Sequence, residues 1–260
     1  WSPEDARYSV IRYLASDVQN ASGPHVHDPR TGEILESDIQ WYHNVMNLVR
    51  NWYFVQTAAA NPPARAVEFD DEVMGRLIRF VSSHEVGHTL GLPHNMGSSV
   101  AYPVDSLRSA TFTQKYGTAP SIMDYARFNY VAQPGDEGGA LMPNIGIYDK
   151  YAIRWGYRPI PDKTAKEEKS ILDEWILEHA GDPLYRFGHQ QAGDVVDPSS
   201  QTEDLGDDAV KASTYGIMNL KRIVPNLETW TAEKGKNYDD LSEMYGQVIS
   251  QFNRYMRQVY

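Results

Sequence analysis

Three histidines and a glutamate lie within eleven residues of this chain, in the segment HEVGHTLGLPH at 84–94. His84 and His88 are four residues apart, so on a helix their imidazoles lie one turn apart on one face and can hold the same metal ion. Glu85 projects about 100° around that helix from His84. It can therefore reach the open side of the ion without being a ligand.

The third histidine must reach the ion from outside the helix. On a continuing helix, His94 would point roughly 240° away from His88. Gly91 permits the left-handed conformation that ends a helix, and Pro93 cannot continue one. Three neutral imidazoles with one open position are typical of hydrolytic zinc sites, and nitrogen ligands favour zinc over calcium or magnesium. The spacing therefore predicts one catalytic zinc ion on the three histidines, with Glu85 taking a proton from a zinc-bound water.

One long helix must position two of the three histidines. It is predicted to begin near Asp70 and Asp71, because carboxylates suit a helix N-terminus. Its apolar stripe points inward and leads directly into the histidines: Val73, Leu77 and Val81 are followed on the stripe by His84 and His88.

Elsewhere the chain has few strand signals and many helical ones. Aromatic and β-branched residues at 6–16 predict a strand, and turn residues within 23–35 predict a hairpin. Apolar spacing predicts four further helices, at 38–59, 144–159, 207–224 and 238–260. We therefore expect a mainly helical α+β fold with a small N-terminal β-sheet.

The composition excludes several classes of function. The 260 residues carry a net charge of −11 without a basic stripe, so nucleic acid is not an expected partner. There is no cysteine, which rules out disulfides, cysteine-ligated zinc and a thiol nucleophile. No apolar run approaches the ~20 residues of a membrane-spanning helix. Because the chain begins at Trp1 rather than Met, we expect a processed or trimmed piece of a longer protein.

The segment 84–94 matches HExxHxxGxxH, the signature of the metzincin metallopeptidases. Metzincins also carry a Met-turn, a tight loop whose methionine lies beneath the metal. SIMDY at 121–125 resembles that turn, with Met123 as its methionine. The resemblance implies a zincin-like catalytic domain with its cleft between two subdomains. The upper one would be 1–91, with an edge hairpin and the active-site helix, and the lower one 92–260, with the third ligand and the Met-turn.

Tyr125, two positions after Met123, adds detail to this resemblance. In the astacin- and serralysin-like branches of the metzincins, a tyrosine at this position approaches the metal, and its phenol binds the oxyanion that develops during hydrolysis. The resemblance therefore implies a catalytic part for Tyr125. The alternative is a tyrosine that packs under the site with no catalytic part.

Much of 1–160 also resembles a group of large bacterial extracellular metal-dependent peptidases. The resemblance lies in GPHVHDPRTGEILESDIQWYHN at 23–44 and YDKYAIRWGY at 148–157. It implies an extracellular, periplasmic or cell-surface location. Metzincins usually have a larger sheet before the active-site helix than the 70 residues here can form. We therefore expect part of that sheet either to be missing or to come from sequence upstream of this piece.

Together these features predict a zinc-dependent endopeptidase acting on peptide or protein substrates. The substrate would lie extended and antiparallel to an edge strand, for which the hairpin at 23–36 is the candidate. The segment 126–145 would form one wall of the pocket on the C-terminal side of the scissile bond. Two alternatives stay open. One is an exopeptidase, which needs a charged group near one end of the cleft; the other is a zinc-binding scaffold or adhesion module that does not cleave.

Other candidate ligands have simpler explanations. His25 and His27 face the same side of a predicted strand, but without a third ligand a solvated strand face is favoured over a second metal. The segment 197–208 is rich in oxygen ligands for calcium, yet its spacing is not that of an EF-hand loop. Three remaining histidines are interpreted as ordinary polar or partly buried residues: His43, His179 and His189.

Overall fold

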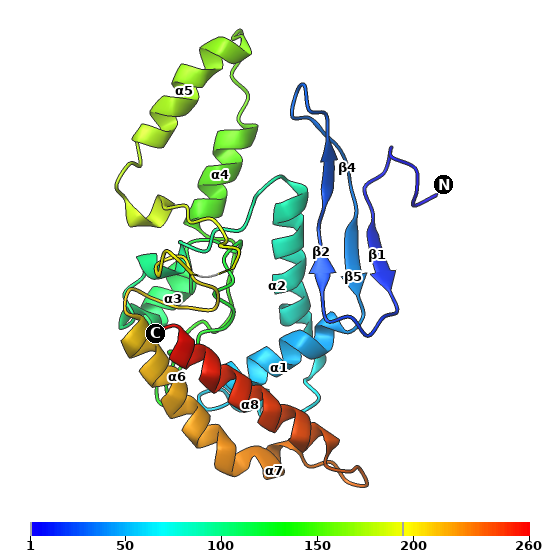
Figure 1. The fold of residues 1–260 in the computed structure, drawn as a ribbon, viewed down its shortest axis with the longest axis vertical. Coiled ribbons are helices and arrows are strands. Elements are labelled where there is room, and N and C mark those ends of the chain that lie inside the picture. Colours follow the sequence, from blue (N-terminus) through cyan, green and yellow to red (C-terminus); the bar gives the residue numbers. More distant parts are fainter. Residues whose placement is uncertain (1, 194) are drawn as a thin grey trace.

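The computed structural model describes residues 2–193 and 195–260, and it confirms a mainly helical α+β fold (Figure 1). A small β-region from the N-terminal part of the chain lies on one side of helix α2, and loops with α3 and α4 lie on its other side. The strands are β1 (Ile11–Leu14), β2 (Ala21–Ser22), β3 (His25–His27), β4 (Ile34–Ser37) and β5 (Ile39–Tyr42). The α-helices are α1 (Val45–Thr57), α2 (Asp71–Thr89), α3 (Ala110–Tyr116), α4 (Ile147–Tyr157), α5 (Ala165–Leu177), α6 (Ala209–Ile223), α7 (Leu227–Thr231) and α8 (Asp239–Arg257).

The strands form two small sheets. In the first, the strand order is β1-β5-β2, with β1 parallel and β2 antiparallel to β5. In the second, β3 and β4 pair as the expected antiparallel hairpin, with a bulge between Val26 and His27. β2 is thus an edge strand, and it is the strand of its sheet that lies nearest to α2 in Figure 1.

The predicted helix at 38–59 is wrong at its start. Residues 39–42 form strand β5, and the helix begins only at Val45. The apolar positions 39, 42 and 45 suit a helix, but Ile39 and Trp41 are the buried residues of this segment, which is the alternation of a strand. The segment is a strand because it pairs with β1 on one side and β2 on the other, and no local sequence pattern predicts that pairing.

The core lies around α1, which packs against α2, α6 and α8. Phe54 of α1 and Leu77 of α2 are fully buried there. The predicted helices that include α4, α6 and α8 are confirmed, each trimmed by one to three residues at its ends. Because α1 precedes residue 91 and packs against helices that follow it, the division into 1–91 and 92–260 stays a prediction.

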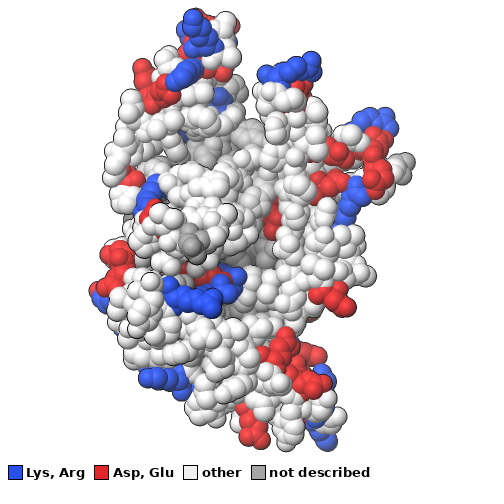
Figure 2. Space-filling model, in the orientation of Figure 1, with Lys and Arg blue, Asp and Glu red and all other residues white. Residues whose placement is uncertain are grey.

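Two arms project beyond the end of α2, the β3–β4 hairpin on one side and the α4–α5 pair on the other (Figure 1). The molecular surface is hollowed between these two sides (Figure 2). Within the described residues, no helix is both long and apolar enough to cross a membrane.

Candidate metal centre

Helix α2 carries His84 and His88 on its inward face, as its sequence predicts. Its N-terminus is capped by the Asp70 side chain, which accepts a hydrogen bond from Val73 N at 2.8 Å. The helix ends at Thr89, where Gly91 has a φ of 86° and Leu92 N donates to Gly87 O at 3.0 Å. Only glycine adopts that φ without strain, so the turn that redirects the chain toward His94 depends on it.

The three imidazoles meet at one point. One ring nitrogen from each of His84, His88 and His94 lies within 4.8 Å of the others, and this is the group of three possible ligands found among the described residues. The ring centroids of His88 and His94 are 4.6 Å apart, and those of His84 and His88 are 4.8 Å apart. The turn at Gly91 therefore brings His94 to His84 and His88, as the sequence predicts.

Each histidine is held by an oxygen that accepts from its Nδ1. The acceptors are Ile122 O at 2.7 Å for His84, Leu92 O at 2.9 Å for His88 and Gln190 Oε1 at 2.6 Å for His94. An oxygen acceptor fixes the proton on Nδ1 and leaves the Nε2 lone pair free. Such partners are the usual supports of metal-binding histidines.

The Nε2 atoms lack suitable partners in the protein. His84 Nε2 is buried without a hydrogen bond, and the Nε2 atoms of His88 and His94 lie 3.0 Å apart. Because His88 and His94 each carry their proton on Nδ1, the two neighbouring Nε2 atoms bring their lone pairs together. A shared cation satisfies all three atoms, so the donor set fits a zinc ion.

Burial keeps the three rings neutral. It lowers the pKa of His84 to about 3, and it also lowers the pKa values of His88 and His94. The hydrogen bonds from Nδ1 oppose this shift without reversing it. Neutral imidazoles are the form that binds a metal, so the ligands need not lose a proton first.

Glu85 lies in the same cleft and is 6% exposed. Burial raises the pKa of its carboxyl to about 7, although a hydrogen bond from the Gly23 backbone opposes the shift. The cleft has a volume of about 590 Å³, and its walls are residues 20–25 on one side and the segment of Gly91–His94 with Tyr125 on the other. Glu85 is therefore near the histidines without belonging to their cluster.

Tyr125 stacks against two of the ligand rings. Its ring centroid lies 4.4 Å from that of His94 and 5.4 Å from that of His84. Burial and the nearby Glu85 carboxylate raise the pKa of the phenol. Tyr125 is thus protonated at neutral pH and can donate a hydrogen bond within the cleft.

The turn that carries Met123 lies directly under α2. Met123 is 1% exposed, and its sulfur contacts the position where Gly87 has no side chain. Asp149 of α4 holds the turn from below, because its carboxylate accepts from Ser121 Oγ at 2.6 Å and from Ile122 N at 2.8 Å. The expected Met-turn is therefore present as a buried, hydrogen-bonded loop.

Replacing Gly87 with alanine should destabilise the fold. The new Cβ would overlap Met123 Sδ, and this methionine is too buried to move aside freely. We expect a loss of about 1–3 kcal/mol in the free energy of unfolding, measured by urea denaturation. The matched control is Gly75→Ala in the same helix, where a Cβ meets nothing within 4 Å and should add up to about 1 kcal/mol. Equal effects of the two changes would contradict the contact.

The remaining histidines stay outside the cluster. His25 Nδ1 lies 3.0 Å from His88 O, so this side chain borders the site without joining it, while His27 is exposed. His43 contacts Tyr13, and His179 stacks on Tyr185. His189 Nδ1 lies 2.6 Å from Gln190 O.

The acidic segment 197–208 makes contacts inside the protein. Glu203 pairs with Arg127 and Arg254, Asp207 accepts from Val104 N at 2.9 Å, and the Asp208 side chain caps α6. Asp204 is buried near Asp124 of the Met-turn. No calcium-type group of three acidic ligands occurs in this segment within the described part of the chain.

Comparison with known families agrees with this geometry. A family model described as Met-zincin matches residues 66–260, which is most of the chain and includes the histidine cluster and the Met-turn. The chain belongs to the Met-zincin family. This confirms the metzincin resemblance, and the cluster of His84, His88 and His94 is consistent with a zinc site. No curated protein and no solved structure matches this Met-zincin chain.

Several supports of the site could not be identified from the Met-zincin sequence motif. Gln190 is 96 residues from His94, its hydrogen-bond partner, and Asp149 lies 28 residues from Ser121. Glutamine and aspartate are common in loops and helix ends, so neither residue has a local signal. Only Asp149 carries a hint, as an acidic residue in the first turn of a predicted helix.

Proposed function

We propose that this Met-zincin is a zinc-dependent endopeptidase. One observation carries the proposal: the three histidines cluster at an open cleft, which His88 and His94 line together with a buried glutamate outside the cluster. A purely structural zinc site usually closes its fourth position with another ligand and needs no neighbouring base. That difference favours catalysis over the scaffold or adhesion module.

His84, His88 and His94 would hold the ion, which when bound supplies Lewis acidity and lowers the pKa of a coordinated water. Glu85 accepts a proton from the water that attacks the peptide carbonyl. It then delivers this proton to the leaving amine. Its buried position, with a pKa raised toward neutral, suits both roles. The Tyr125 phenol donates a hydrogen bond to the oxygen of the attacked carbonyl as negative charge develops there.

The substrate would align along β2. This edge strand and the residues after it form one wall of the cleft, and its free edge offers backbone hydrogen bonds to an extended peptide. The 23–36 hairpin contributes Gly23, Pro24 and His25 to that wall, beside the two residues of β2. In this proposal the edge is therefore β2 with the first residues of the hairpin.

The segment 126–145 divides between two surfaces. Arg127 lines a small pocket that adjoins the cleft, since Glu85 and Tyr125 line both. Residues 140 and 142–145 instead line a separate pocket of about 480 Å³ with Arg76 and Arg79. We propose that only the beginning of this segment contacts the substrate near the scissile bond.

Tyr125→Phe should reduce kcat by about a hundredfold or more while zinc content is unchanged, because one oxyanion donor is lost. The measurement is steady-state cleavage of a fluorogenic peptide, with metal content checked by elemental analysis. The exposed Tyr238 provides the control, Tyr238→Phe, which should behave as wild type. A Tyr125→Phe enzyme with unchanged kcat would mean that this tyrosine only packs under the site.

The proposal as a whole is tested by zinc analysis together with cleavage of a peptide library, with and without a chelator. We expect zinc at one ion per chain and cleavage that the chelator stops and added zinc restores. Stoichiometric zinc with no chelator-sensitive cleavage would favour the scaffold. An extracellular or cell-surface location is a further proposal, which rests on the resemblance to bacterial extracellular peptidases alone.

A further inference from the structure

A small pocket opens next to Glu85, between α1 and α2. Its volume is about 90 Å³, and apolar side chains of α1 and α2 form most of its wall. Four ionisable side chains also line it, of which Glu85 and Tyr125 are shared with the main cleft: His84, Glu85, Tyr125 and Arg127. The mechanism uses the first three and leaves Arg127 without a role.

Arg127 is held in an unusual setting. It is one of the few non-glycine residues with a positive φ, 54°, and its guanidinium carbon lies 3.3 Å from the ring centroid of Trp52, which also lines the pocket. Its side chain is 14% exposed, and burial lowers its pKa to about 9. Holding a cation in such a place is costly unless an anion compensates it.

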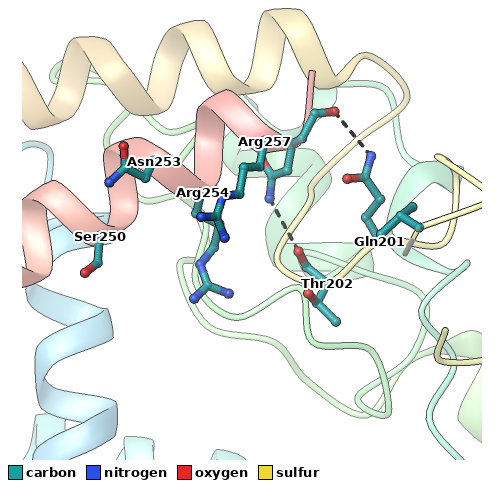
Figure 3. Close-up of a pocket in the computed structure, with 8 residues that line it drawn as sticks. Gln201, Thr202, Ser250, Asn253, Arg254 and Arg257 are labelled. Atoms are coloured by element: carbon teal, nitrogen blue, oxygen red, sulfur yellow. Dashed lines mark hydrogen bonds between the residues drawn. The ribbon is translucent and has the colours of Figure 1, made fainter. Parts of the chain in front are cut away.

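The compensation inside the protein is incomplete. Arg127 Nη2 pairs with Glu203 Oε1 at 2.6 Å, but the same oxygen also pairs with Arg254. Arg254 belongs to α8 and lines a different pocket with Gln201 and Thr202 (Figure 3). Two cations thus share one buried carboxylate. Arg254 is 40% exposed and can be solvated, whereas Arg127 is buried and has only this shared anion among the described residues.

Most donors of Arg127 are also unused. A guanidinium has five N–H groups, and within the described residues the Glu203 contact is the only hydrogen-bonded ion pair that Arg127 makes. The planar fork of these groups matches a carboxylate with two parallel hydrogen bonds. The other ionisable side chains in the pocket are those of His84, Glu85 and Tyr125, which the proposed reaction occupies.

The direction of β2 assigns this pocket to one side of the scissile bond. Residues 20–25 line the main cleft, but only Asn20 and Ala21, at the start of β2, also line the small pocket. A substrate antiparallel to β2 places its C-terminal part opposite the start of that strand. The pocket therefore faces the residue that follows the cleaved bond.

We propose that Arg127 binds a substrate carboxylate immediately after the scissile bond, so that this enzyme selects an acidic residue or the chain terminus there. The inference rests on the proposed peptidase function. The carboxylate can come from an Asp or Glu side chain or from the C-terminus of the substrate. Either one accepts two parallel hydrogen bonds from the guanidinium. The second source would make the enzyme an exopeptidase, for which a charged group at one end of the cleft is required.

The test compares matched peptides with the zinc-loaded enzyme. One pair has Glu or Gln after a single cleavable bond, with an amidated C-terminus, and the second pair ends one residue after the bond as free acid or amide. We expect kcat/KM to be about 10–100-fold higher for the carboxylate member of at least one pair, as for a charged hydrogen bond. Equal rates within both pairs would overturn the role of Arg127, whereas no cleavage of any peptide would instead count against the peptidase function.

Variants separate this role from folding. Arg127→Met should abolish the preference, and Arg254→Met should keep it, although each change removes one of the two partners of Glu203. A second readout uses the inactive Glu85→Gln protein, whose Kd for the Glu peptide should be about tenfold or more below that for the Gln peptide. If the Arg127→Met protein retained the preference, or if Arg254→Met lost it equally, the assignment to Arg127 would be wrong.

Discussion

Replacing Glu85 with glutamine should reduce peptide cleavage by about 10²–10⁴-fold, which is the usual contribution of a general acid–base residue. Glutamine has nearly the same shape, so the Gly23 backbone contact and the cleft are expected to persist. Zinc content should stay at the wild-type level, because Glu85 does not belong to the ligand cluster. The measurements are kcat/KM on a fluorogenic peptide and the zinc content of the dialysed protein.

The control for this change is Glu72→Gln, on the exposed face of the same helix. It removes the same charge without touching the cleft, so its activity should match that of the wild type. A Glu85→Gln enzyme that cleaves at the wild-type rate would show that another group handles the proton. Loss of zinc together with activity would instead mean that Glu85 helps to hold the metal.

Replacing His88 with alanine should remove the metal and the activity together. His88 supplies one of three converging nitrogens, and its loss leaves two ligands where a catalytic zinc site uses three. We expect zinc to be lost on dialysis and kcat/KM to fall by at least about 10³-fold, since the ion supplies several kcal/mol of transition-state stabilisation. Elemental analysis of dialysed protein and peptide cleavage check the two effects.

The matched control for His88→Ala is His27→Ala. His27 is exposed and outside the cluster, so both zinc content and activity should be retained. Circular dichroism of both variants would show whether the fold persists. If His88→Ala kept stoichiometric zinc and full activity, the metal would have to be bound elsewhere.

The histidine cluster could be predicted from the sequence because its geometry is local. His84 and His88 share a helix face through their spacing, and Gly91 determines the turn that brings His94 back. Such relations depend on φ, ψ and helix period, which neighbouring residues largely decide. The same holds for the cap at Asp70. The buried turn around Met123 was instead expected from the resemblance to metzincins, and the distant Asp149 helps to hold it.

Strand β5 shows where local patterns fail. Its apolar residues suited a helix, but hydrogen bonds to β1 and β2 on either side made it a strand. Strand pairing joins residues far apart in the chain, so periodicity within a short segment cannot report it. The sequence suggested the 23–36 hairpin as the edge. In the structure the cleft wall combines Gly23, Pro24 and His25 of that segment with Asn20 and the two residues of β2.

By itself, the sequence determined the clustering of the three histidines and the mainly helical fold class, since each depends on residues a few positions apart. It also predicted Glu85 as the base, and the resemblance to metzincins supplied the Met-turn. Only the tertiary structure decided which oxygens hold the imidazoles, as with Gln190 on His94. It alone brought Arg127 onto Trp52, with a single buried carboxylate shared between Arg127 and Arg254. Burial and charge balance depend on distant segments packing together, and those are the quantities from which we infer substrate choice.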